Sequence, residues 1–173
     1  MPQSDASRYP STGARVATRF FPLSPALRPY VSTIYLSEVS IADGGRVEDY
    51  LHPEWANLRF VEGEAPLAAI GGSPIAEMPR FIATGPTSVA TYFAAGNMRT
   101  WGIGILPMGW AKFIPLPAEE LADRLTDGST HPAFAAFAPL LETLRPVNDV
   151  DGAAALIDAH VWALLADAPP VDP

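Results

Sequence analysis

The chain has 173 residues, 49% of them hydrophobic and 17% charged, so it forms one globular domain, or one domain with a helical appendage, and is not disordered. It contains no cysteine, which excludes disulfides, thiolate metal sites and thiol catalysis. No apolar run approaches the roughly 18 residues of a membrane-spanning helix, and residues 1–19 hold no apolar signal-peptide core, so we expect a cytoplasmic protein.

The net charge of −8 is concentrated toward the C-terminus. Residues 1–117 carry nine acidic and nine basic side chains, whereas residues 118–173 carry ten acidic side chains against only Arg124 and Arg145. A surface that binds duplex nucleic acid needs clustered Lys and Arg to displace counterions from the phosphates. We therefore do not expect this chain by itself to bind DNA or RNA.

The first hundred residues predict a mainly β fold. Residues 1–19 are expected to be a flexible N-terminal arm, and Ser24-Pro25 begins a short helix that Pro29 ends. From residue 30 onward, β-rich segments alternate with Gly- and Pro-containing turns about every ten residues, which is typical of an antiparallel sandwich or barrel. The expected strands are residues 30–39, 46–51, 57–61, 67–70, 80–84, 88–94 and 99–106.

The last of these strands has two contrasting faces. Alternation along it places Gly102 and Gly104 on one face and large side chains such as Trp101 on the other. Glycines on one face allow close approach of another backbone or leave room for a ligand. We expect a tight turn at residues 107–109 after this strand.

The pattern changes to helical after residue 117. Residues 118–166 are expected to contain two or three helices: one opening at residues 117–120, one over 131–144, and a final one. Ala154, Ile157, Val161 and Leu164 form a heptad seam on the final helix. Either this seam pairs two subunits or it packs on the protein's own β domain, and the pattern favours neither. The Pro-rich residues 167–173 are linker-like.

No residue set argues for catalysis or for a metal. His52, His131 and His160 are too far apart in sequence for chelate spacing, and no paired histidines with a carboxylate occur. The nucleophile elbow, the phosphate-binding loop and the dinucleotide fingerprint are all absent. We therefore expect no catalytic residues, no metal and no cofactor. His131 precedes Pro132 at a helix start, where it can act as a cap, and we expect His160 at the surface or in an interface.

Aromatic side chains and one arginine are the candidate ligand-binding residues. Tyr and Trp supply stacking area and one hydrogen bond each in a small-molecule pocket. For Arg59 the exposed face is the favoured interpretation, because buried arginine is rare, but on an interior face Arg59 could bind an anionic ligand bidentately. The candidate set is His52, Trp55, Arg59, Tyr92 and Trp101.

The order and spacing of several short motifs resemble the N-terminal sensor domain of AraC-type transcription regulators over about residues 20–145. The family usually has Pro-Gly-Gly or Pro-Gly-Ala where this chain has Pro-Met-Gly at 107–109. The motifs are Phe-Pro at 21–22, Leu-Arg-Pro-Tyr-Val at 27–31, His-Pro at 52–53, Asn-Leu-Arg-Phe at 57–60, Thr-Gly-Pro at 84–86, Gly-Ile-Gly-Ile-Leu-Pro at 102–107 and Leu-Pro-Ala-Glu-Glu-Leu at 116–121.

The resemblance implies a cupin-like β-barrel at residues 20–117 that holds a small effector, followed by helices at 118–166 that form a homodimer. DNA would be bound only through a C-terminal helix-turn-helix domain that this sequence does not include. We therefore expect an effector-sensing, dimerising regulatory domain without catalysis. The alternatives are a stand-alone cupin-like isomerase or hydrolase, which requires a cluster of His and carboxylates, and a ligand-free dimerisation module with a solidly packed barrel.

Overall fold

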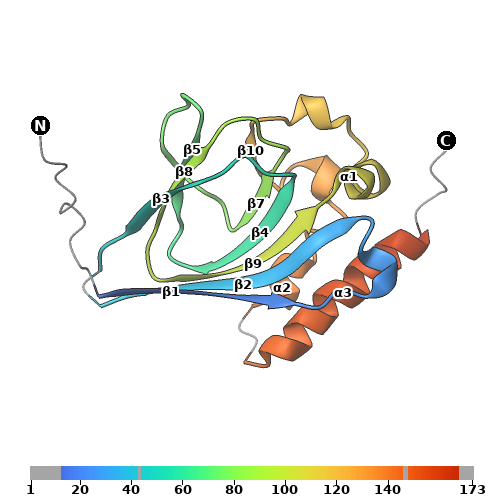
Figure 1. Cartoon of the computed structure of the whole chain (residues 1–173), viewed down its shortest axis with the longest axis horizontal. Helices are drawn as coiled ribbons and strands as arrows, with labels where there is room; N and C mark the ends of the chain where they lie inside the picture. Colours follow the sequence, from blue (N-terminus) through green and yellow to red (C-terminus); the bar gives the residue numbers. More distant parts are fainter. Residues whose placement is uncertain (1–12, 43, 146–147, 168–173) are drawn as a thin grey trace, which may run out of the picture.

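The computed structural model describes residues 13–42, 44–145 and 148–167, which form two antiparallel sheets and three α-helices (Figure 1). The large sheet has the strand order β1-β2-β9-β4-β7-β10, and the small sheet has the order β3-β8-β5-β6. The strands are β1 (Ala14–Phe21), β2 (Val31–Ile41), β3 (Val47–Leu51), β4 (Asn57–Gly63), β5 (Leu67–Ile70), β6 (Ala76–Glu77), β7 (Phe81–Thr84), β8 (Thr91–Ala95), β9 (Met98–Ile105) and β10 (Leu125–Asp127). The helices are η1 (Pro25–Leu27), α1 (Pro107–Phe113), η2 (Ala118–Glu120), η3 (Pro132–Phe134), α2 (Leu140–Thr143) and α3 (Val150–Asp167).

The expected mainly β class with antiparallel sheets and C-terminal helices is confirmed, and every strand expected from the sequence is present. Residues 67–70 form β5 with the expected bounds, and the other strands begin or end within a few residues of expectation. The two sheets remain separate in the part of the chain that the structure describes, with no strand pairing that closes them into a barrel.

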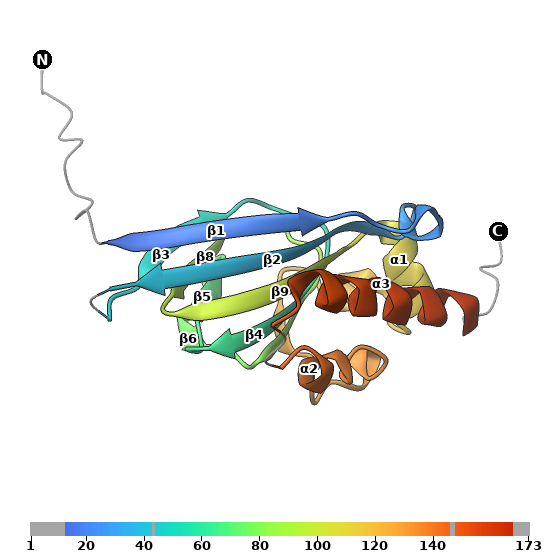
Figure 2. The same ribbon diagram turned by 90° about the horizontal axis from the view of Figure 1, so that it is seen from below.

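The hydrophobic core lies between the large sheet and the helices. Ile34, Leu58 and Ile103 are fully buried neighbours on the outer face of this sheet, because β2, β9 and β4 are paired in register there. The helices cover that face (Figure 2). The small sheet lies on the opposite side of the large sheet, so both faces of the large sheet are covered (Figure 1).

The heptad seam of α3 is part of this core. Ala154, Ile157 and Val161 are buried within the core cluster, and Leu164 packs against its edge. Helix α3 lies against β2, η1 and α1 of its own chain. Assignment of this seam to a dimer interface is therefore wrong. The apolar outer face of the large sheet has to be removed from water, and α3 is the long helix that covers it.

Two structured segments replace parts that were expected to be irregular. The described part of the expected arm forms β1, which pairs with β2 along its whole length, from Ala14 opposite Ile41 to Phe21 opposite Ile34. Residues 1–12 of that arm lie outside the described residues. Residues 107–109, expected as a turn, instead begin α1, because a proline at the first helical position costs no hydrogen bond.

The expected helical segment also contains a strand. Strand β10 pairs with β7 at the edge of the large sheet, with Thr126 opposite Ala83. The helix expected over residues 131–144 is instead η3, a series of turns and the short helix α2. Pro132 and Pro139 provide the reason, since each lacks the N–H that a continuous helix needs. Of the linker-like tail, only Asp167 is described, and it ends α3.

Adjacent residues of α3 test this packing. Replacing the fully buried Ile157 with alanine should lower the free energy of unfolding by about 2–5 kcal/mol, because it leaves a cavity in the core. The same truncation at Leu156, which is 49% exposed, should change it by less than about 0.5 kcal/mol. Urea denaturation at low protein concentration measures both variants, and equal losses would contradict the placement of α3.

Candidate functional site

A cavity of about 590 Å³ lies between the two sheets. This volume is within the usual range for small-molecule sites. The inner face of the large sheet forms one wall and carries most of the polar side chains, and the small sheet forms the other wall. The cavity therefore has a polar side and an apolar side.

A hydrogen-bonded group centred on Arg59 occupies the polar wall. The Arg59 guanidinium donates to Glu54 Oε1 at 2.5 Å, to Thr84 Oγ1 at 3.1 Å and, through Nε, to the Tyr35 hydroxyl at 3.1 Å. Tyr35 in turn donates to Asn57 Oδ1 at 3.3 Å, and Asn57 Nδ2 donates to Glu54 Oε2 at 3.3 Å. Both carboxylate oxygens of Glu54 are thus engaged within the group.

This arrangement keeps Arg59 charged inside the molecule. Its side chain is 14% exposed and that of Glu54 is 28% exposed. Burial alone lowers the pKa of Arg59, but its interactions with Tyr35 and Glu54 outweigh burial and raise the pKa above its ordinary value. The pair is close to neutral as a unit, which is the condition for placing a guanidinium in the interior.

A row of hydroxyl groups crosses the same wall, two residues along the strands from Arg59. The register aligns Thr18 of β1, Ser37 of β2 and Thr100 of β9. The Thr18 and Ser37 hydroxyl oxygens are 3.2 Å apart and share a hydrogen bond. Thr100 is 5% exposed, and its hydroxyl has no hydrogen-bond partner among the described residues. A buried unpartnered hydroxyl is costly and is often explained by a ligand or water.

The glycine face of β9 lies beneath Tyr35, which lines the cavity. A Cβ atom built on Gly102 would lie 2.0 Å from Cζ of Tyr35, so the tyrosine ring lies directly over this glycine. Gly104 is approached by Ser32 in the same way. Close packing therefore explains the glycines, and it places the Tyr35 hydroxyl within reach of Arg59.

The small sheet contributes the apolar wall. Strands β3 and β8 present alternate residues to the cavity, with Asp49 and Thr91 as the polar exceptions. Asp49 is exposed and lies at the rim, where its carboxylate accepts from the Tyr50 backbone N–H. The apolar side chains on this wall are Val47, Leu51, Pro66, Ala68, Met78, Phe93 and Ala95.

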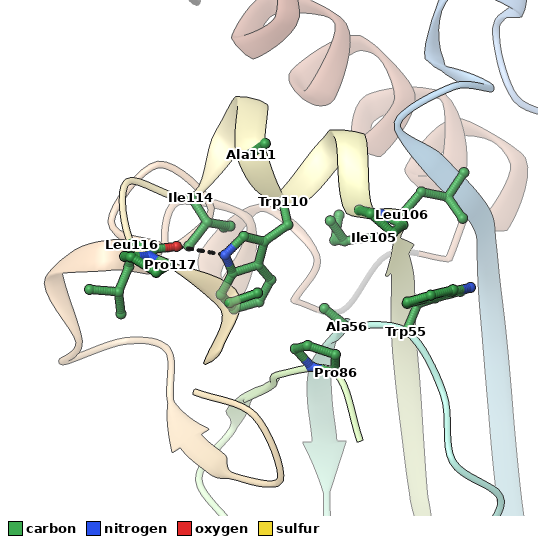
Figure 3. A pocket seen from close by; sticks show the side chains of 12 residues that line it. Trp55, Ala56, Pro86, Ile105, Leu106, Trp110, Ala111, Ile114, Leu116 and Pro117 are labelled. Carbon is green, nitrogen blue, oxygen red and sulfur yellow. Dashed lines mark hydrogen bonds between the residues drawn. The ribbon is translucent and has the colours of Figure 1, made fainter. Parts of the chain in front are cut away.

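A second hollow of about 480 Å³ is a groove beside α1 (Figure 3). No charged side chain lines it, and the Trp110 indole N–H is already bonded to the Leu116 carbonyl oxygen at 2.6 Å. Figure 3 shows the Trp110 ring directed from α1 toward Leu116, with Trp55 on the segment before β4. Polar groups that would orient a ligand converge in the cavity and not in this groove, so the cavity is the candidate site.

One short segment takes part in both hollows. Glu54 lines the cavity, while Trp55 and Ala56 line the groove. Thr87 holds the segment, since its hydroxyl accepts from the Glu54 N–H at 2.8 Å and its own N–H donates to the Glu54 carbonyl at 2.9 Å. The Ala56 carbonyl accepts from the Ile105 N–H at 2.7 Å. A displacement of Glu54 would therefore be transmitted to the groove.

Two of the five candidate ligand residues line a hollow. Arg59 is at the centre of the cavity wall, so the favoured exposed placement is wrong and the interior placement holds. Trp55 is 59% exposed and lines the groove. Side-chain alternation along β4 could not show whether Arg59 is buried or exposed, because both faces of the large sheet are covered.

The other three candidates lie away from the cavity. Trp101 is 4% exposed and packs against Phe21 in the core, on the opposite face of the large sheet. Tyr92 contacts Tyr50 on β3, with ring centroids 5.6 Å apart, and does not line the cavity. Partial desolvation and the nearby Glu48 carboxylate raise its pKa. His52 is exposed just after β3 and lines neither hollow.

The candidate ligand residues predicted from the sequence omit four members of the polar group: Tyr35, Glu54, Asn57 and Thr84. Asn57 and Arg59 are two residues apart on β4, so period-2 alternation does place them on one face. Glu54 precedes β4 in an irregular segment, where no periodicity could have placed it.

The histidines do not form a cluster. His131 caps η3 as expected, with its Nδ1 accepting from the Ala133 N–H at 3.3 Å. His160 Nε2 lies 2.8 Å from the Ala136 carbonyl oxygen. Among the residues that the structure describes, no group of three or more His, Asp or Glu side chains is placed to hold a metal ion.

The close approach of Tyr35 to Gly102 gives a direct test of how this wall of the cavity is packed. Gly102→Ala should lower the free energy of unfolding by about 1–3 kcal/mol, because the new methyl group displaces a ring held by two hydrogen bonds. Gly72→Ala is the control, since nothing lies within 4 Å of its Cβ position, and it should be neutral or slightly stabilising. Thermal and urea denaturation measure both, and a neutral Gly102→Ala variant would contradict the packing.

No helix in the described part of the chain is long and apolar enough to span a bilayer. Comparisons with family models, with curated proteins and with solved structures give no significant match to this chain.

Proposed function

We propose that this chain is a sensor module that binds a small molecule in the cavity between its two sheets. The observation that carries this proposal is the convergence of Arg59, Tyr35 and Asn57 on one wall of a 590 Å³ cavity whose other wall is apolar. Small-molecule sites typically combine a largely apolar lining with a few fixed polar groups. Binding and not catalysis is proposed, because the carboxylate and guanidinium are bonded to one another.

The proposal extends to the regulatory class that the sequence motifs suggest. A strand-rich half followed by helices is the order implied by an AraC-type sensor domain with a cupin-like barrel. In such a protein DNA would be bound by a further domain, and the present chain would supply the effector response in the cytoplasm. This part of the proposal rests on motif order and on the arrangement of elements.

A route for the response begins at Glu54. This residue belongs to the cavity wall, and its neighbours Trp55 and Ala56 belong to the groove beside α1. Helix α1 contacts α3. A ligand that binds one arrangement of this segment more tightly than another shifts the population toward that arrangement, and the helices would respond.

We further propose that two copies associate through the outer face of α3. Between Gly152 and Asp167 every exposed position of this helix is apolar. Four of these positions, 155, 159, 162 and 166, are spaced 4, 3 and 4 residues apart, which is a heptad stripe opposite the buried seam. The exposed set is Ala155, Leu156, Ala159, Trp162, Ala163 and Ala166.

The charge distribution supports a second copy as the partner on this face. The chain carries a net charge of −8, so the acidic surfaces of two copies repel one another. The exposed positions of α3 between residues 152 and 166 carry no charge, and the partly buried Asp158 beside them is bonded to Ser24. The alanines of the stripe allow two helices to approach closely. Trp162, 52% exposed, would supply the large apolar anchor.

Ligand binding can be tested with N-phenyl-1-naphthylamine, an uncharged probe that fluoresces in apolar sites. Wild-type protein should bind it saturably, and Ala68→Trp, which fills the apolar wall of the cavity, should weaken binding by about tenfold or more. Ala42→Trp, at an exposed position outside both hollows, is the control and should bind like the wild type. No saturable binding, or no effect of Ala68→Trp, would contradict the proposed function.

The dimer is tested by light scattering at tens of micromolar protein. The wild type should have the mass of a dimer, and Trp162→Glu should be monomeric because it places a carboxylate in an apolar interface. Trp55→Glu is the matched control, since Trp55 is similarly exposed but lies away from α3, and this variant should remain dimeric. A monomeric wild type would rule out the dimer, and a dimeric Trp162→Glu would rule out this face.

A further inference from the structure

We infer that the cavity accepts an uncharged, mainly apolar molecule that carries hydroxyl or carbonyl oxygen, and that it discriminates against anions. The inference rests on the proposed function, because it names the chemical class of the ligand for the same cavity. It departs from the sequence-based alternative in which Arg59, on an interior face, binds an anionic ligand.

Arg59 already has its counter-ion within the protein. Its guanidinium is bonded to the Glu54 carboxylate, and its side chain is only 14% exposed. A ligand carboxylate or phosphate at this wall would bring a second negative charge next to Glu54, which is itself only partly exposed. Like charges placed side by side repel one another and weaken binding. Asp49 at the rim adds a further negative charge to the path of an approaching anion.

The same ion pair also disfavours cations. An ammonium group could approach Glu54 only by lying beside the Arg59 guanidinium, because the two side chains are in direct contact. The second oxygen of Glu54 already accepts from Asn57 Nδ2. Removing an ammonium from water at the Arg59 wall is unfavourable, because neither Glu54 oxygen is free there and the Asp49 carboxylate lies at the rim, away from this group. The internal ion pair therefore discriminates against both signs of charge.

The polar wall also supplies neutral hydrogen-bonding groups for a ligand. Thr18, Ser37 and Thr100 form a row of hydroxyls across the polar wall. Thr100 is 95% buried and its hydroxyl is unpartnered among the described residues. A hydroxyl can donate to a carbonyl oxygen or exchange hydrogen bonds with another hydroxyl. An alcohol or ketone group at this row would satisfy Thr100 without introducing a charge.

The wall opposite the polar wall is apolar and suits the hydrocarbon part of such a ligand. Strands β3, β5 and β8 present Val47, Leu51, Ala68 and Phe93 toward the cavity. A hydrocarbon chain or ring system would lie against these side chains while its oxygen group faces the hydroxyl row. Apolar contact of this kind supplies most of the affinity, and the polar groups fix the orientation.

Three probes with the same hydrocarbon chain separate the effect of charge from that of shape. At about pH 8, 1-decanol is neutral, decanoate is an anion and decylamine is a cation. Each is titrated against bound N-phenyl-1-naphthylamine, with decanoate and decylamine kept below their critical micelle concentrations and 1-decanol below its solubility limit. We expect 1-decanol to displace the probe at concentrations about tenfold or more lower than either charged compound.

Glu54→Gln tests whether the internal counter-ion causes the discrimination. With this carboxylate removed, Arg59 lacks its partner, and decanoate should gain about tenfold or more in affinity while 1-decanol changes little. Glu77→Gln removes an exposed carboxylate on β6, outside the cavity lining, and should leave the order of the three compounds unchanged. If Glu54→Gln fails to fold, the wild-type comparison alone decides the inference.

The outcomes are distinguishable from failure of the proposed function. If the fluorescent probe itself does not bind, or binds independently of Ala68→Trp, the proposed function fails. If the probe binds in the cavity and decanoate or decylamine displaces it as well as 1-decanol does, the inference on charge is overturned and the cavity remains a binding site. An unchanged preference in a folded Glu54→Gln protein would overturn the role of Glu54.

Discussion

The ion pair between Arg59 and Glu54 is the constraint on which the character of the cavity depends. A guanidinium in the interior is tolerated only where a counter-ion and hydrogen bonds compensate for its lost hydration. Glu54, Tyr35 and Thr84 provide that compensation. The same bonds hold the Tyr35 ring over Gly102 and fix the irregular segment before β4 to the sheet. The polar wall is therefore a prearranged unit.

The large sheet separates two interiors with different chemistry. Its outer face carries residues such as Ile103 against the helices, and its inner face carries Arg59 and the hydroxyl row against the cavity. Because α3 is needed to cover the outer face, its heptad seam is buried in the core of its own chain. What remains on this helix is the exposed stripe around Trp162, which is why the proposed dimer contact moves to the opposite side of the helix.

The strands and helices with a regular pattern could be predicted from the sequence. Which face of the large sheet lines the cavity could not. Turn signals located β5, and alternation correctly put the glycines of β9 opposite Trp101. It could not say which face was the cavity, because most residues of β9 are buried on both faces. For that reason Trp101 was expected at the ligand. The exposed face was favoured for Arg59, itself a candidate ligand residue, because buried arginine is rare. Glu54 lies outside any periodic segment, so only the folded chain brings it to Arg59.

The central claim is that the space between the sheets is a binding site with one polar and one apolar wall. The most direct measurement is a methyl NMR titration of isotope-labelled protein with 1-decanol. The account predicts saturable shifts at cavity methyls such as those of Val47 and Val61, with Ile157 in the core unaffected. Shifts confined to methyls of the groove, such as that of Ala111, or no saturable shifts at all, would contradict it.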